Sequence, residues 1–486
     1  MDLINDFRRY LTKPHVRPWA LSSPVLVLII CLPLLRPLRH PDPGGVSTDE
    51  IVRLATVQAI VEHHTLALDD TLKRSPGQTI SGYHDGRRYS DQPPVMAVLL
   101  SGSYWAMHQR GLTIDENPIL VPYLLTIIAV TLPVAGAAGL VYRMGRLFEL
   151  KRPIRAALGA AVVLGSGLLS YGVVLNAHAP AAVLVMCSAA CFVHLAISKR
   201  PVSSVWLIVA GFCAALAATL EPAAAVFAVL LAFVPLAMRW RPTMRIGGAL
   251  LYCIGATAPL VLHAVLTVPI TGDFLPGMFH PELAEANDDR YAAAPDFVAA
   301  GSPDDAVTGA EDDFAQGAQQ SSWWTELWHD TLRVIGALVG THGLFSHFPV
   351  LILGLAGVGA IMHRHWPTAT KVMAAATVAG ASFVIITFAT ATPAHTGSMF
   401  AARWFVVFLP LLLFWSGVWV RRQHHAVTWS VAGILLAFSV AVTLIGATNP
   451  FPREGYDRYT AAQALQELLH PTPTPSPRNE TLLAGG

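Results

Sequence analysis

Two adjacent carboxylates are the first residues in this sequence that could carry out chemistry. Asp49 and Glu50 follow Thr48, shortly after the first apolar run of the chain ends. A carboxylate at the boundary between water and lipid can take a proton from an acceptor hydroxyl, or it can bind a divalent cation. Thr48 and Asp49 can also cap the start of a helix. On residue chemistry alone, both roles stay open.

A second polar cluster stands just before the two prolines at 93–94. It contains Arg87, Arg88 and Tyr89. Guanidinium groups are always charged and bind phosphate in a bidentate manner. The alternative is a solvated turn, because the Asp-Gly pair at 85–86 is a turn signal. The cluster is therefore a candidate anion-binding site or an exposed loop tip.

Two histidines and a third arginine stand in later polar turns. His178 lies in the turn at 176–180, where it can bind phosphate or sugar or cap the next helix. His395 precedes Arg403, which begins another apolar run. A charge inside or near the bilayer is costly and usually serves a function. We therefore expect Arg403 to bind the anionic headgroup of a lipid.

No spacing typical of a metal site accompanies these residues. The five cysteines all lie within apolar runs and give neither a disulfide framework nor a zinc pattern: Cys31, Cys187, Cys191, Cys213 and Cys253. No cofactor follows from the sequence. A divalent metal stays open, and its ligands are unknown.

The composition indicates that these polar residues are mounted on a membrane protein. Of the 486 residues, 53% are hydrophobic and only 13% are charged, and the mean hydropathy is +0.50. A soluble domain carries about 25% charged residues. The formal net charge of +1 gives no reason to expect a nucleic-acid partner.

The apolar runs predict an all-α fold, a polytopic membrane helical bundle of about 11–12 transmembrane helices with amphipathic outer-loop helices. A spanning helix needs roughly 20 mostly apolar residues. After a first run at 19–35, the predicted spans lie near 93–108, 118–142, 154–175, 179–197, 203–220, 222–238, 246–268, 345–362, 370–391, 403–420 and 427–447.

Basic residues set the predicted orientation, because short cytoplasmic loops are rich in Lys and Arg. Residues 1–18 form a basic, cytoplasmic N-terminus, and later basic loops alternate with polar turns that lack them. The active site is then extracytoplasmic, and we expect a bacterial plasma membrane protein. The alternation leaves one crossing too many before residue 143. The short segment at 93–108 is therefore re-entrant or interfacial, or else the basic-residue rule fails there.

Two outer loops and a tail complete the predicted organisation. The loop at 37–92 is expected to be catalytic and to contain an amphipathic helix along the membrane at 50–64. The acidic loop at 269–330 is predicted to be mobile in its middle, and Trp323, Trp324 and Trp328 form an aromatic anchor where the chain re-enters. Residues 448–486 are predicted to form an extracytoplasmic, proline-rich tail.

The order of these motifs resembles the membrane glycosyltransferases of the GT-C type, which take sugar from a polyprenyl-phosphate carrier. The protein O-mannosyltransferases and the aminoarabinose transferases belong to this group. The resemblance covers residues 19–447 and rests on the motifs at 48–50, 85–94, 176–180, 343–349 and 397–404. The chain departs from the group in three ways: it has Thr48 in place of the commoner glycine, we expect it to lack the large soluble C-terminal domain of some relatives, and its acidic loop at 269–330 is longer.

The resemblance implies a site and a reaction. Asp49 would be the general base, with Glu50 as its neighbour or substitute, and the transfer would invert the anomeric centre. Arg403 would hold the lipid phosphate, helped by Arg87 or Arg88. The other donor-binding candidates are Tyr89, His178 and His395. The implied partners are a polyprenyl-phosphate sugar donor and a lipid, glycan or protein acceptor.

Two rival functions remain. A transporter or lipid flippase predicts charged pairs within the spans and often an internal repeat. The sequence has few such charges and no repeat, and its polar candidates collect at one face. A catalytically inert subunit on the same fold is the second rival, and the sequence offers nothing against it.

Overall fold

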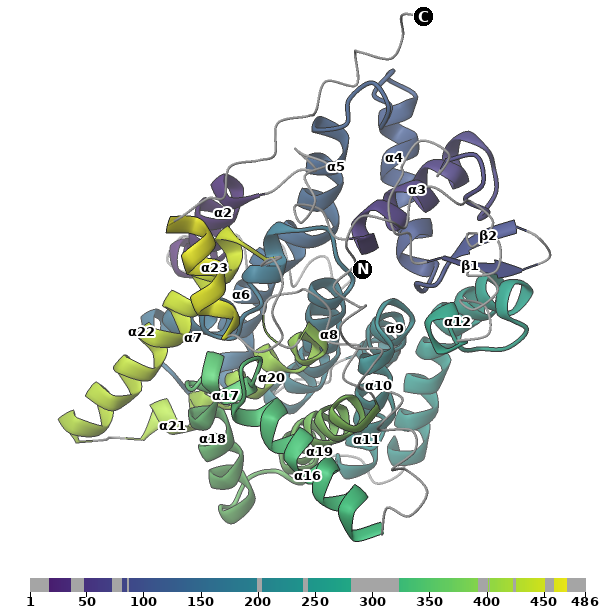
Figure 1. Cartoon of the computed structure of the whole chain (residues 1–486). Helices are drawn as coiled ribbons and strands as arrows, with labels where there is room; N and C mark the ends of the chain where they lie inside the picture. The colour runs from purple at the N-terminus through teal and green to yellow at the C-terminus, as the bar shows by residue number, and fades with distance from the viewer. Residues whose placement is uncertain are drawn as a thin grey trace, which may run out of the picture.

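The computed structural model confirms an all-helical membrane bundle (Figure 1). It describes residues 17–35, 48–71, 81–84, 87–198, 203–238, 244–280, 323–391, 401, 403–422, 425–450 and 459–469. The described part of the chain has one sheet, an antiparallel ribbon of two strands that pairs Ser81 with Ser90.

The first elements of the chain are α2 (Arg17–Leu34), α3 (Thr48–Glu62), β1 (Ser81–His84), β2 (Arg87–Ser90) and α4 (Val95–His108). They are followed by α5 (Leu120–Thr126), η2 (Ile127–Thr131), α6 (Leu132–Met144), η3 (Gly145–Phe148), α7 (Arg152–Gly165), η4 (Ser170–Val173) and α8 (His178–Ile197).

The middle of the chain contains α9 (Val205–Leu220), η5 (Pro222–Ala224), α10 (Ala225–Leu231), α11 (Val234–Ala237), α12 (Met244–Thr271) and η6 (Gly277–Phe279). The last elements are α16 (Trp323–Val339), α17 (Leu344–His347), α18 (Leu351–His363), α19 (Thr368–Ala391), η10 (Arg403–Val407), α20 (Leu409–Phe414), α21 (Ser416–Arg421), α22 (Ala426–Thr448) and α23 (Thr460–Leu469).

Fewer helices are long enough to span a membrane than the 11–12 expected. Within the described ranges, five helical stretches are long and apolar enough to cross a membrane, or six if one bent pair counts as a span. Four further apolar helices are shorter, at Pro18–Leu34, Val205–Leu220, Pro222–Ala237 and Leu409–Arg421. Breaks inside apolar runs account for part of the difference, because hydropathy alone does not show them.

The clearest such break lies in the run predicted as one helix over 154–175. α7 ends at Gly165, and Gly167 has a φ of +73°. A Cβ atom at Gly167 would lie 2.4 Å from the Phe348 ring, so only glycine fits this turn. The chain then forms η4 and reaches residue 174 without crossing again.

The segment at 93–108 also differs from a full span. α4 has 14 residues, which corresponds to a length of about 21 Å. The hydrocarbon core of a bilayer is about 30 Å thick. The length of α4 therefore favours the re-entrant or interfacial alternative for this segment.

α3 forms close to the predicted helix at 50–64, but it is buried on more than one side. Its apolar residues Val52 and Val57 are fully buried, and so are the polar residues Arg53 and Thr56. α3 packs against α4. It is therefore part of the folded body and does not present one polar face to water, as an interfacial helix would.

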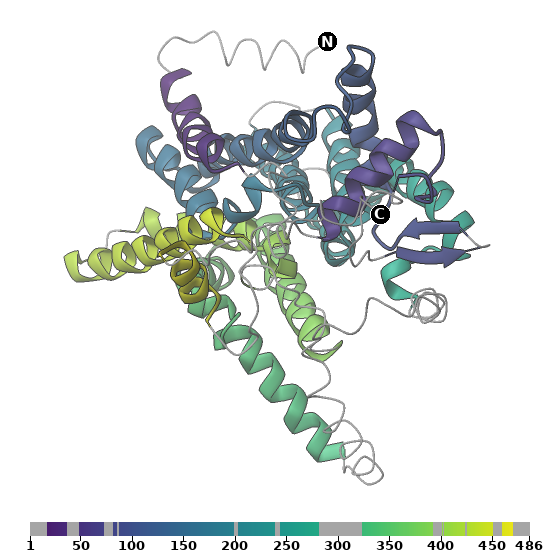
Figure 2. The same cartoon turned by 45° about the horizontal axis from the view of Figure 1, so that its top comes forward.

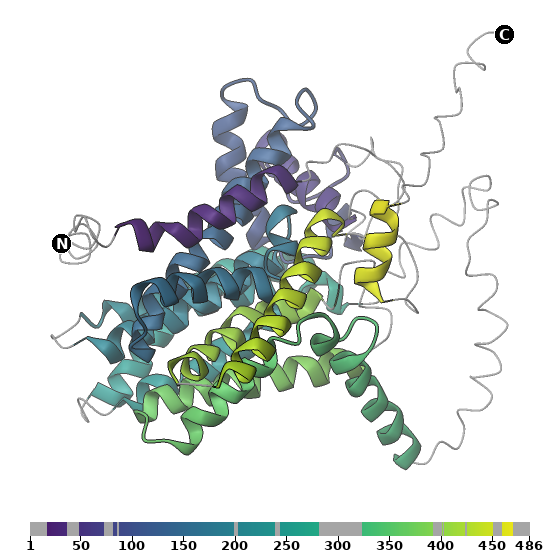
Figure 3. The same cartoon turned by 90° about the vertical axis from the view of Figure 1, so that its left-hand side faces the viewer.

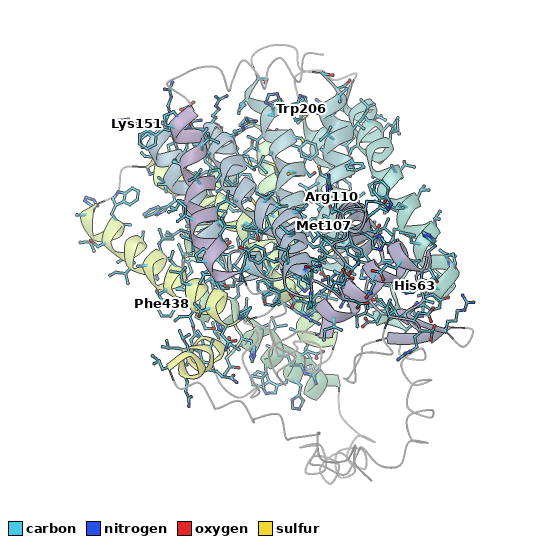
Figure 4. The ribbon with its side chains drawn as sticks, turned by 90° about the horizontal axis from the view of Figure 1, so that it is seen from above. His63, Met107, Arg110, Lys151, Trp206 and Phe438 are labelled. Carbon is cyan, nitrogen blue, oxygen red and sulfur yellow. The ribbon has the colours of Figure 1, made fainter. Side chains whose placement is uncertain are left out.

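The ends of the bundle separate the basic loops from the first polar loop. Figure 3 shows the long helices running side by side along one direction, with the N-terminal end of α2 at one end of the bundle and α23 at the other. Figure 4 places Lys151 and Trp206, which adjoin two basic loops, at one edge, and His63 of the α3 segment toward the opposite edge. Which of these two edges faces the cytoplasm stays a prediction from the basic residues.

α16 leaves the bundle sideways. Figure 2 shows it projecting from the body of the protein. The stretches Leu327–His347 and Leu351–His363 pass the span test together but are bent by 96° relative to each other. Trp324 and Trp328 are exposed on α16. If α18 crosses the membrane, α16 lies near the membrane plane, where tryptophan side chains are favoured.

α9 and α12 touch through their backbones. A Cβ atom at Gly211 of α9 would lie 1.8 Å from the carbonyl oxygen of Tyr252, and one at Gly255 of α12 would lie 1.9 Å from that of Ile208. Small residues let helices approach this closely in lipid, where packing drives association. We refer to this pair of contacts as the α9–α12 seam.

Gly255→Ala is expected to destabilise the protein by about 1–3 kcal/mol, because the added methyl group meets backbone that must move. The measurement is the unfolding temperature in detergent. Gly247→Ala on the same helix is the control, since a Cβ atom there meets nothing within 4 Å. Equal unfolding temperatures for the two variants would contradict the seam.

Candidate functional site

The start of α3 is docked onto the turn before α8. The Oε1 atom of Glu50 accepts a hydrogen bond of 2.7 Å from the backbone N–H of Leu175. Arg53, one helical turn later, donates to the Leu175 carbonyl oxygen at 3.3 Å and to the side-chain oxygen of Gln92. The first polar loop and the turn at 174–178 are therefore joined by buried hydrogen bonds.

Asn176 holds that turn in shape. Its side-chain amide donates to the carbonyl oxygens of Tyr171 at 2.6 Å and Val174 at 2.8 Å, and its Oδ1 atom accepts from the N–H of Ala179 at 2.9 Å. The last bond satisfies one of the unpaired N–H groups at the start of α8. Asn176 thus takes the capping role that the sequence also allowed for His178.

His178 faces a buried carboxylate instead. Its Nδ1 atom lies 2.6 Å from the Oε2 atom of Glu221, although the approach departs from the direction of a good hydrogen bond. The side chains are only 8% and 3% exposed. Among the described residues, the Oε1 atom of Glu221 has no hydrogen-bond partner. A buried polar atom of this kind costs free energy unless something binds it.

Aromatic rings enclose the histidine. The ring centroid of His178 lies 6.1 Å from that of Tyr171 and 5.5 Å from that of Trp404, both at steep angles. Trp404 in turn stacks on Phe388 of α19, with centroids 4.5 Å apart. These contacts bring α8, α19 and η10 together around one imidazole.

Arg403 lies at the edge of this enclosure. It begins η10 and is half-buried, with its guanidinium carbon 4.7 Å from the centroid of the Trp404 ring. The structure thus brings Arg403 close to His178 through Trp404, and the donor-binding role of both residues stays a prediction.

The predicted donor-binding residues Arg87, Arg88 and Tyr89 lie on β2 of the two-stranded ribbon. Arg87 is exposed, and Tyr89 is half-buried opposite Gly82. The backbone N–H of Arg88 donates to Asp69 at 3.3 Å, and its Nε atom lies 3.8 Å from the same carboxylate. These contacts anchor the ribbon beside the end of the α3 segment.

The beginning of the acidic loop also reaches this region. The N–H of Met278 in η6 donates to the carbonyl oxygen of Asp91 at 2.9 Å. Figure 2 shows the two-stranded ribbon near the end of α12. The loop that follows α12 therefore begins beside the polar cluster that precedes α4.

Two predicted site residues fall outside what the structure describes. His395 lies outside the described residues, and so does the side chain of Asp49, whose backbone belongs to the first turn of α3. Among the described side chains, no group of three His, Cys, Asp or Glu residues is placed to hold a metal ion. The described residues thus do not form a metal site on their own.

The predicted site residues did not include three members of this cluster: Arg53, Glu221 and Trp404. Arg53 is the one basic residue of α3 and stands three residues after Glu50, which is a usable signal for a buried partner. The contact between Trp404 and His178 joins residues too far apart in the chain for any spacing rule.

No protein-family model and no curated protein sequence matches this chain. Solved structures match it in fold. The Archaeoglobus fulgidus oligosaccharyltransferase AglB, in complex with an inhibitory peptide and a dolichol-phosphate, aligns with 94% of this chain at 13% identity and a TM-score of 0.52. This chain spans 58% of the length of AglB.

A second solved structure is similar over most of its own length. ArnT from Cupriavidus metallidurans, bound to undecaprenyl phosphate, aligns with 93% of this chain and 68% of its own, at 13% identity and a TM-score of 0.50. At this identity the likeness concerns the fold. The chain therefore shares the polytopic helical fold of AglB and ArnT.

Proposed function

We propose that this protein is an integral membrane glycosyltransferase. It moves a sugar from a polyprenyl-phosphate carrier to an acceptor on the extracytoplasmic face of a bacterial plasma membrane, with inversion at the anomeric carbon. The fold supports the general kind of enzyme. The two similar structures contain a dolichol-phosphate and undecaprenyl phosphate, which are lipid carriers of the proposed class.

The observation that carries the proposal is the turn at 174–178. Its backbone binds Glu50 and Arg53 at the start of α3, and it leads directly into His178. His178 contacts Trp404, the neighbour of Arg403. One rigid turn therefore connects the loop that carries the proposed base with the cluster that carries the proposed phosphate ligand.

In the proposed step, the acceptor attacks the anomeric carbon while the bond from that carbon to the phosphate oxygen breaks. Asp49, in the first turn of α3, takes the proton from the acceptor nucleophile. The electron pair of the breaking bond stays on the phosphate oxygen and leaves with the lipid phosphate. The attack comes from the side opposite the leaving group, so the anomeric configuration inverts.

Arg403 stabilises the negative charge that develops on the leaving phosphate. Its guanidinium can bind two phosphate oxygens at once, and stacking on Trp404 holds its plane in place. A fixed charge beside a developing anion lowers the barrier, because the site is already organised when the bond breaks. His178, which faces Glu221, contributes a second polar contact on the same side.

The remaining candidates take outer positions in this proposal. The distal part of the donor binds to the ribbon residues Arg87, Arg88 and Tyr89, and the phosphate also binds His395. The acceptor is a lipid, a glycan or a protein. Whether a divalent metal takes part is left to experiment, and the steps above do not use one.

The test is turnover by the purified protein in detergent with a panel of polyprenyl-phosphate sugars. Release of free lipid phosphate and transfer of labelled sugar to extracts of lipid, glycan and protein acceptors are measured together, with and without added divalent metal. Transfer with at least one donor is the expected result. A properly folded protein that turns over none of the donors would contradict the proposal and favour a transporter or an inert subunit.

A further inference from the structure

A buried chain of hydrogen bonds connects the C-terminal helix with the Arg403 turn. Thr460 begins α23 and is 2% exposed. Its Oγ1 atom lies 2.6 Å from the Nε2 atom of His347 and 3.3 Å from the backbone nitrogen of Ala401. His347 is fully buried, and Ala401 is buried as well. One hydroxyl therefore joins three segments that are far apart in the sequence.

The direction of each bond in this chain follows from the chemistry of the groups. The Nδ1 atom of His347 lies 2.9 Å from the Gly343 carbonyl oxygen, which can only accept, so Nδ1 carries the proton. In the neutral imidazole, Nε2 then accepts from the Thr460 hydroxyl. The hydroxyl oxygen keeps a lone pair for the N–H of Ala401, so every partner in the chain is satisfied.

The start of α23 is seated on the same turn by two more contacts. The hydroxyl of Tyr459 donates to the carbonyl oxygen of Ser346 at 2.7 Å, and its ring centroid lies 4.4 Å from that of His347. The N–H of Thr460 points to the carbonyl oxygen of Thr341 at 3.4 Å. The helix is thus fixed where its threonine can reach Ala401.

Ala401 is the residue that needs such a partner. Its φ of +53° lies in the left-handed region, which alanine adopts only at a cost. Strained residues of this kind persist where their surroundings hold them, and they gather at functional sites. Ala401 stands two positions before Arg403, at the point where the chain turns into η10.

We propose that α23 is a positioning element for the donor site. Thr460 binds the N–H of Ala401, holds it in the left-handed conformation, and so fixes the position of Arg403 at the start of η10. This inference rests on the phosphate-binding role proposed for Arg403. Thr460 and His347 act through the backbone of Ala401 and are positioning residues.

The test compares Thr460→Val, which removes the hydroxyl at nearly constant shape, with Thr460→Ser, which keeps it. We expect Thr460→Val to raise the KM for the lipid-linked donor about tenfold, the effect of one buried donor left without its partner. Hydrogen exchange in the peptide that contains residues 401–407 should speed up at the same time. Thr460→Ser should restore both values to within about twofold of wild type.

Two further variants complete the design. His347→Phe removes the acceptor of the Thr460 hydroxyl but keeps a ring beside Tyr459. It should also raise KM and speed up exchange at 401–407, and it replaces Thr460→Val in the test if that variant does not fold. Gln466→Ala, on the exposed side of α23, should change neither value. Wild-type KM and wild-type exchange in both Thr460→Val and His347→Phe would overturn the inference. So would faster exchange with an unchanged KM.

The exchange measurement separates this inference from the proposed function. If the wild type turned over no donor, the transferase proposal would fail, and so would the role of α23 in donor binding. Exchange at 401–407 would still show whether Thr460 holds the turn. If the wild type is active and Thr460→Val matches it in both readouts, only the positioning role fails.

Discussion

Asp49→Asn is expected to lower kcat for sugar transfer by a factor of about 10²–10⁴, the usual contribution of a general base. The amide cannot take a proton from the acceptor, whereas its size and shape are unchanged. Asp49 lies in the first turn of α3, where losing the carboxylate charge costs at most about 1 kcal/mol of interaction with the helix dipole, so the unfolding temperature should fall little. The measurement is single-donor turnover at saturating acceptor, with thermal unfolding on the same preparations.

Glu50→Gln is the matched control for this prediction. The Glu50 carboxylate is buried and accepts from the N–H of Leu175, so its described role is to dock α3. Glutamine keeps an oxygen for that bond but loses the charge beside Arg53. We expect a loss of about 1–3 kcal/mol in stability and a change in kcat of less than about threefold. The opposite pattern, full activity in Asp49→Asn and collapse in Glu50→Gln, would make Glu50 the base.

Arg403→Lys should raise the KM for the lipid-linked donor about tenfold, and Arg403→Ala should lower kcat/KM by a factor of about 10²–10³. Lysine keeps the charge but cannot bind two phosphate oxygens in one plane or stack on Trp404 as a guanidinium does. The loss with alanine is larger because no charge remains for the leaving phosphate.

The control for Arg403 is Arg333→Lys on α16. Arg333 is exposed and pairs with Asp330, one turn earlier on the same helix. Arg333→Lys should leave KM and kcat within about twofold of the wild-type values, because exposed ion pairs of this type contribute little free energy. If Arg403→Lys behaved like Arg333→Lys, the lipid phosphate would have to be held by other residues, and the ribbon residues Arg87 and Arg88 would be tested next.

The helical membrane class could be predicted because it follows from local composition. Long apolar runs indicate helices that lie in lipid, and the distribution of basic residues among the loops predicts the orientation of those helices. The break at Gly167 could not be predicted in the same way. It depends on the ring of Phe348 occupying the space beside the glycine, and that contact is remote in sequence.

The contacts within the candidate site could not be predicted from the sequence either. The sequence picked out Glu50, His178 and Arg403 from their positions at the ends of apolar runs. It could not show that Glu50 is engaged by the Leu175 backbone, or that Glu221 faces His178. Both facts depend on which turns meet at the outer end of the bundle, and hydrophobic periodicity carries no information about that.

The α9–α12 seam restricts how a long lipid can reach the outer turn. Because backbone touches backbone between Gly211 and Tyr252 and again between Gly255 and Ile208, three residues away on each helix, the two helices leave no space between them at this point. An isoprenoid chain is wider than the space left by a missing side chain and cannot slide between them. Under the proposed function, the hydrocarbon part of the donor is therefore expected to approach the site from another side of the bundle, past α9 and α12 and not between them.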